Sequence, residues 1–141
     1  MKRMRGEKGA ALIEAAVTVP IILLISVGIF EFGRAYQTQQ VLTNAAREGA
    51  RVAVIEGTTD ADVRTRVRDY VTRGGLTTLT DGQIVVQRAV PLTGSSTASS
   101  VEINYPFQFM VLNPVVRLVA PTDTTTGAPI TMKAATLMRN E

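Results

Sequence analysis

An apolar run of 21 residues, from Ala10 to Phe30, lies close to the N-terminus, and its only charged residue is Glu14. A helix rises about 1.5 Å per residue, so this run is long enough to cross a hydrocarbon core about 30 Å thick. A domain of this size rarely has enough protein around such a helix to bury it on every side. The run therefore predicts a membrane-spanning helix over residues 10–34 rather than a buried core helix.

Four basic residues and one acid lie among the first nine positions: Lys2, Arg3, Arg5, Lys8 and Glu7. The whole chain has fifteen Lys and Arg and twelve Asp and Glu, so eleven of each remain when these five are set aside. The rest of the chain is neutral, which argues against a nucleic-acid-binding surface. The basic flank favours a cytoplasmic N-terminus, which places residues 35–141 outside the cytoplasm, anchored in the inner (cytoplasmic) membrane.

A cleaved secretory signal is the competing interpretation of the same N-terminus. Ser26-Val27-Gly28 has the small residues that a signal-peptidase site requires. However, the apolar run exceeds the usual length of about 7–15 residues for a signal sequence, and the helical pattern continues beyond it. The sequence therefore favours an anchor that is not removed at this point.

The composition argues against catalysis. The chain has no Cys and no His, which excludes the common nucleophile–base systems and the usual zinc sites. No Gly-rich phosphate loop follows a predicted strand, and the acids are dispersed. Asp60 and Asp62 fit a helix start better than a metal site, because Asp is strongly preferred there. We therefore expect no enzyme activity, no cofactor, no metal and no small-molecule substrate.

Glu14 needs an explanation of its own, because a carboxylate within an apolar helix costs about 2.5–3.5 kcal/mol on insertion scales. A position near the helix N-terminus lowers that cost, so an interfacial, capping Glu14 is one interpretation. The other comes from the surrounding residues, Gly9-Ala10-Ala11-Leu12-Ile13-Glu14, which resemble the processing site of the type IV pilin superfamily. The resemblance implies that a prepilin peptidase removes a leader, residues 1–9, by cutting between Gly9 and Ala10. It also implies that Glu14 pairs with the new α-amine of Ala10, in its own or a neighbouring subunit.

Two further segments extend the resemblance: Phe30-Glu31-Phe32-Gly33-Arg34 and Asn44-Ala45-Ala46-Arg47-Glu48-Gly49-Ala50-Arg51. They are similar to the signature of TadE-like proteins, and the ending Ala134–Glu141 also resembles that family. The resemblance implies a minor pilin, or pseudopilin, that supports assembly of a tight-adherence (Flp) pilus. The implied partners are the membrane lipid bilayer, a prepilin peptidase, other pilins and the pilus assembly platform proteins. The alternative is an uncleaved single-pass anchor that carries a small extracytoplasmic binding domain.

The first helix is predicted to run past the membrane to about Val54. Small residues form a stripe along this outer half, with Ala45, Ala46, Gly49 and Ala50 at three- and four-residue spacing. We expect the stripe to pack on the chain's own sheet, with a contact between subunits as the alternative. Beside it lie three charged residues whose surplus positive charge predicts a partner carboxylate in the sheet or another subunit: Arg47, Glu48 and Arg51.

The remaining residues predict an α+β domain over 35–141. A shorter helix is expected to begin at Thr59 or Asp60 and to stop at Gly74-Gly75. Three antiparallel strands are predicted to pack on the helices, over residues 83–90, 101–109 and 130–138. Polar loops are expected at 92–100 and 121–127, and the apolar segment 110–120 is expected to cover the open side of the sheet, with a subunit contact as its alternative.

Overall fold

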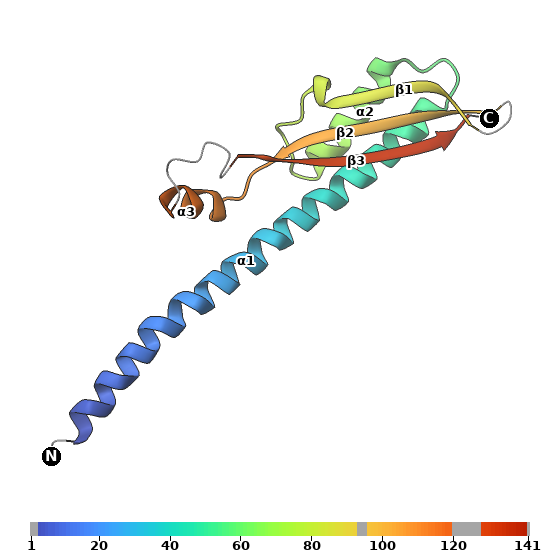
Figure 1. Ribbon diagram of the computed structural model, residues 1–141. Coiled ribbons are helices and arrows are strands. Elements are labelled where there is room, and N and C mark those ends of the chain that lie inside the picture. The colour runs from blue at the N-terminus through green and yellow to red at the C-terminus, as the bar shows by residue number, and fades with distance from the viewer. Residues whose placement is uncertain (1–2, 93–95, 120–127, 141) are drawn as a thin grey trace. The chain divides into compact units, whose positions relative to one another are not determined.

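The computed structural model describes residues 3–92, 96–119 and 128–140. Within these residues, three helices, one short 3₁₀ helix and three strands follow one another (Figure 1): α1 (Arg3–Ala53), α2 (Asp60–Arg73), η1 (Asp81–Gln83), β1 (Ile84–Pro91), β2 (Thr97–Phe107), α3 (Leu112–Val119) and β3 (Ile130–Arg139). The strands form one antiparallel sheet in the order β1-β2-β3. The predicted α+β class, with its long N-terminal helix, is confirmed.

The chain divides into two compact units, and α1 contributes to both. One unit joins Met1–Gly33 with Phe109–Gly127, and so contains the N-terminal part of α1 together with α3. The other joins Arg34–Gln108 with Ala128–Glu141, and so contains the C-terminal part of α1, α2 and the whole sheet.

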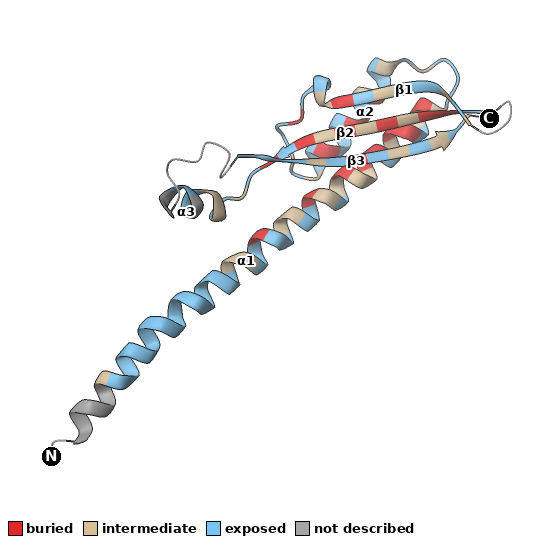
Figure 2. Cartoon of the chain, in the orientation of Figure 1, coloured by how far each residue is buried: buried red, intermediate tan, exposed pale blue. Residues whose placement is uncertain are grey.

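The core of the sheet unit is built from mainly small residues on α1, valines on α2, and branched and aromatic residues on β2. In each helix the apolar side chains recur at helical spacing, so they form one stripe that faces the core. Along β2 every second side chain is buried, as expected for a strand with one covered face. Both helices lie on one face of the sheet (Figure 1), and Figure 2 shows where the buried residues gather: Leu42, Ala45, Ala46, Ala50, Val63, Val67, Val71, Val101, Ile103, Tyr105 and Phe107.

The ends of α2 are fixed by local hydrogen bonds. Thr59 is the N-cap, and its hydroxyl and backbone amide exchange hydrogen bonds with Asp62 in a capping box. At the C-terminus, Gly75 has a positive φ of 84°, and the amide of Leu76 donates to the carbonyl of Val71 at 3.0 Å. This is the Schellman arrangement, in which glycine avoids the steric cost of the left-handed conformation. The predicted start and stop of α2 are confirmed.

Position 74, next to that turn, requires glycine for a different reason. A Cβ atom added there would lie 2.5 Å from Cγ1 of Val41 on α1. Gly74 therefore lets the end of α2 approach α1 closely.

The middle of the sheet pairs in regular antiparallel register, with Ile103 of β2 opposite both Ile84 of β1 and Ala134 of β3. Near the end of β1 the pairing shifts between Gln87 and Val90, and Ala89 takes a φ of 56°. Two residues of β1 thus lie opposite one residue of β2, which defines a β-bulge.

Two sequence predictions need correction. The polar segment 92–100 was expected to be a loop, yet β2 begins at Thr97 because it pairs with strands on both sides. The apolar segment 110–120 was expected to cover the sheet, but its residues 112–119 form α3 and group with Met1–Gly33. The loop predicted at 121–127 lies outside the described residues.

Candidate membrane and assembly site

The N-terminal half of α1 presents exposed apolar side chains, which nothing else in the described part of the chain buries. An 18-residue apolar window within this helix has none of its residues buried, and α1 is the one described helix long and apolar enough to cross a membrane. Pro20 lies inside it without ending the helix. Figure 2 shows the contrast with the C-terminal half, where buried positions appear on α1. Apolar surface of this extent requires lipid or other apolar helices around it.

The predicted processing residues lie at the start of this apolar surface. Gly9 and Ala10 are both within α1, and a Cβ atom added at Gly9 would meet no atom within 4 Å. Glu14 lies one turn further along and is exposed. These positions leave Gly9 and Glu14 open to partners outside the chain. Cleavage at Gly9 and the pairing of Glu14 remain predictions.

Glu31 lies where the apolar run ends, and it is completely buried. Its carboxylate accepts a hydrogen bond from the backbone amide of Val111, just before α3. The neighbouring Phe32 packs edge-to-face on Phe109, with ring centroids 6.1 Å apart. In the sheet unit, Arg34 donates to the carbonyl of Gln108.

The guanidinium of Arg34 also lies 4.6 Å from the centroid of the Phe107 ring. Glu31 and Phe32 therefore contact residues 109–111, just before α3. Within the sheet unit, Arg34 contacts the end of β2 and the residue after it. The sequence singled out these residues as a motif but did not reveal these contacts, because their partners lie more than seventy positions away.

The small-residue stripe of α1 lies inside the sheet unit. Ala45, Ala46 and Ala50 are fully buried, and a Cβ atom at Gly49 would lie 2.5 Å from Cγ2 of Val67 and 3.2 Å from Cγ1 of Val101. The absence of a side chain at Gly49 therefore allows α1, α2 and β2 to meet. The stripe contacts the chain's own helix and sheet, as its first interpretation expected.

Glu48 is the centre of the charged group beside the stripe. Its Oε1 lies 2.8 Å from Nη2 of Arg51 and 2.7 Å from Nη2 of Arg66 on α2. The hydrogen bonds from Arg51 and then Arg66 lower the pKa of Glu48 from 4.5 to about 2. The fold thus adds a second arginine, Arg66, beside Glu48, and Arg47 of the same group is exposed. A partner carboxylate for the surplus positive charge, in the sheet or in another subunit, remains a prediction.

Arg88, at the β-bulge, is a residue that sequence reasoning missed. Its Nε donates to Oδ1 of Asp60 at 2.7 Å, and its Nη1 donates to the carbonyl of Ala53 at 3.0 Å. It therefore joins the end of α1 to the start of α2. No local pattern marks Arg88, because both partners are distant in sequence. Among the described residues, no group of three His, Cys, Asp or Glu side chains is placed to hold a metal ion.

Comparison with protein families gives a match for the N-terminal part of the chain. Residues 9–51 match the family model described as TadE-like protein. This segment is TadE-like. The match begins at Gly9, includes Glu14 and the Glu31 motif, and ends at Arg51 beside the small-residue stripe. The resemblance predicted from the sequence is confirmed over these residues.

The TadE-like segment indicates a pilus-associated protein whose N-terminal apolar helix is a candidate membrane anchor. The match covers just under a third of the chain and ends before α2 and the sheet. Searches of curated proteins and of solved structures gave no match.

Proposed function

We propose that the chain is a non-enzymatic, membrane-anchored minor pilin (pseudopilin) that supports assembly of a tight-adherence (Flp) pilus. In this proposal α1 inserts in the inner membrane with its N-terminus in the cytoplasm, and the sheet unit lies outside. A prepilin peptidase cuts after Gly9, and other pilins and assembly platform proteins are the partners.

The observation that carries the proposal is the position of the exposed apolar surface. It begins directly after Gly9, where the TadE-like match also begins, and it contains a single acid, Glu14. A purely passive anchor needs an apolar helix but has no need of an acid within it, since such an acid opposes insertion. An assembling helix can use the acid, because it pairs with a cation after insertion.

The proposed mechanism follows from the spacing. Cleavage after Gly9 creates an α-amine at Ala10, four residues before Glu14, and residues four apart are neighbours on a helix surface. In lipid the attraction between an ammonium and a carboxylate is only weakly screened, so the pair strongly favours contact. When the amine belongs to a neighbouring subunit, the contact fixes the axial register of the two helices.

Mass spectrometry of the membrane-extracted chain tests the cleavage. Cells that co-express a prepilin peptidase should yield a chain that begins at Ala10. Gly9→Val should block processing, because the resemblance implies glycine before the cut. Gly28→Val is the matched control, since Gly28 also lies in α1 with no atom within 4 Å of an added Cβ, and it should be processed normally. An intact leader in the wild type, with full function, would favour the alternative of an uncleaved anchor.

A second experiment tests Glu14 separately from processing. Glu14→Gln should still be cleaved but should lose most of its co-purification with other pilins, because the amide cannot form the ion pair. Glu56→Gln, an exposed acid beyond the end of α1, is the control and should assemble normally. Normal assembly of the Glu14→Gln chain would refute the pairing role.

A further inference from the structure

We propose that α3 and the residues leading into it form a second membrane contact, in which this segment lies in the lipid headgroup layer beside α1. The inference rests on the proposed membrane insertion of α1. It assigns lipid headgroups as the partner of a surface that the sequence had placed on the sheet.

The first observation is the way in which α3 begins. The amide of Val115 donates to the carbonyl of Val111 at 3.2 Å, so Val111 is the residue from which the helix starts. Its own amide donates to the buried carboxylate of Glu31. In a capping box an acid of the same helix binds this amide. Here the acid comes from α1, so the start of α3 is held at one point along the membrane helix.

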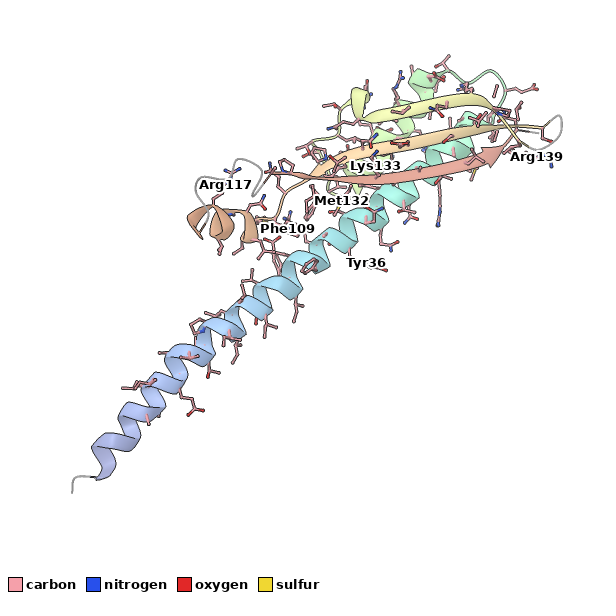
Figure 3. The ribbon with its side chains drawn as sticks, in the orientation of Figure 1. Tyr36, Phe109, Arg117, Met132, Lys133 and Arg139 are labelled. Atoms are coloured by element: carbon pink, nitrogen blue, oxygen red, sulfur yellow. The ribbon has the colours of Figure 1, made fainter. Side chains whose placement is uncertain are left out.

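The second observation is that this point is where the apolar run of α1 ends. Phe30, just before Glu31, is exposed, and Phe32, just after it, is exposed while packing on Phe109. Aromatic side chains are favoured at the boundary between lipid and water. Figure 3 labels Phe109 in the segment that precedes α3.

The third observation is that the exposed apolar surface continues from α1 onto this segment. Met110 is 64% exposed and Val115 is 44% exposed, next to the contacts that Glu31 and Phe32 make. The only charged residue of α3 is Arg117, an exposed cation that suits anionic headgroups (Figure 3). A short apolar helix with a cation, attached at the end of a membrane span, has the properties of an interfacial helix.

Lipid is favoured over a protein partner because of this continuity. Side chains that extend the surface of a membrane-spanning helix at its outer end are surrounded by lipid as soon as the helix inserts. Glu31 then acts as a positioning residue: its carboxylate is buried, and it holds the start of α3 at the boundary.

Site-specific fluorescence tests the inference, because the chain has no native cysteine. Single cysteines at Val115, Ile22 and Val85 would carry an environment-sensitive nitrobenzoxadiazole label. The full chain would be reconstituted in phosphatidylcholine–phosphatidylglycerol vesicles. Nitroxides at carbon 5 or carbon 12 of the acyl chain then quench shallow or deep probes, and iodide quenches probes in water.

The Val115 probe should be quenched at least twofold more by the shallow nitroxide than by iodide. The Ile22 probe should respond most to the deep nitroxide, and the Val85 probe on β1 should respond to iodide. If the Val115 probe behaves as the Val85 probe while the Ile22 probe stays in lipid, the inference is overturned and the membrane anchor stands. If the Val115 probe is protected from all quenchers, protein covers the surface and the inference is again overturned. If the Ile22 probe responds only to iodide, the proposed function fails, and the inference fails with it.

Variants of Glu31 test its positioning role. Glu31→Ala removes the acceptor for the Val111 amide and should reduce shallow quenching of the Val115 probe at least twofold. Glu31→Gln keeps an acceptor oxygen and should retain most of the quenching. The Ile22 and Val85 probes should be unchanged in both variants, which shows that the chain is folded and inserted. Unchanged quenching of the Val115 probe in Glu31→Ala would overturn the role of Glu31.

Discussion

Gly49 is a position where one added methyl group should disturb the core of the sheet unit. In Gly49→Ala the new Cβ would lie 2.5 Å from Cγ2 of Val67, a distance that real Cβ contacts essentially never show. Val67 is β-branched and helical, so its χ1 is stiff and the methyl group cannot simply turn away. Val101, on the other side, would be 3.2 Å away and adds to the crowding.

The magnitude follows from two opposing effects. Overpacking a well-packed core costs about 1–3 kcal/mol. Replacing glycine by alanine within a helix raises the free energy of unfolding by up to about 1 kcal/mol. We therefore expect Gly49→Ala to lower the free energy of unfolding by about 1–2 kcal/mol. Gly33→Ala, in the same helix but with no atom within 4 Å of the new Cβ, should be neutral or slightly stabilising.

A double-mutant cycle identifies the contact responsible. Val67→Ala alone should cost about 2–3 kcal/mol, because it removes two buried methyl groups. In that background Gly49→Ala should become neutral or stabilising, which gives a coupling of about 2 kcal/mol. The assay is urea unfolding of the full chain in a mild non-ionic detergent, followed by tyrosine fluorescence, since Tyr105 is buried in β2. If Gly49→Ala is equally destabilising with and without the Val67 side chain, the proposed contact is refuted.

Three other predictions concern the same unit and the same unfolding assay. Glu48→Gln should cost about 1 kcal/mol near neutral pH, because the ion pairs are largely solvent-screened. The folded-state pKa of Glu48 is lowered from 4.5 to about 2, so the wild-type advantage should be full above about pH 5 and disappear as the pH falls toward 2; a constant difference across this range would contradict the assignment. Ala89→Gly should raise stability by up to about 1 kcal/mol, since glycine tolerates the φ of 56° at the bulge, and a loss of stability would argue against that conformation. Arg88→Lys should cost about 1 kcal/mol, because lysine cannot reach both Asp60 and the carbonyl of Ala53. Asp60→Asn, measured alongside, leaves the hydrogen bond from Arg88 to the Ala53 carbonyl in place. It should therefore lower the free energy of unfolding by less than Arg88→Lys does; an equal or greater loss would show that the bond to Ala53 contributes nothing.

The helices were predictable because their signals lie within a few residues of each other. Thr59 and Asp62 define the start of α2 over four positions, and Gly75 defines its end. Both depend on backbone conformations that the local sequence favours strongly. The alternation of apolar and polar residues along β2 from Val101 onward was equally visible in the sequence, since it repeats every second residue.

The start of β2 was not predictable from such signals. Thr97–Ser100 consists of small, mostly polar residues, a composition typical of a loop. It forms a strand because distant residues pair with it: the amide of Asn140 donates to the carbonyl of Thr97 at 2.8 Å, and the hydroxyl of Ser99 donates to the Asn140 side chain. Strand formation depends on such cross-strand partners more than on intrinsic preference.

The sequence by itself determined the length of the apolar run in α1, the single acid within that run, the caps of α2 and the alternation of apolar and polar residues along β2. These features depend on composition or on neighbours within one or two helical turns. Only the tertiary structure decided that Glu48 meets Arg66, that Gly49 lies between two valines, and that Glu31 holds the start of α3. Each of these contacts joins positions between eighteen and eighty residues apart. No local preference encodes them, because they arise only when separate elements bury their apolar faces together.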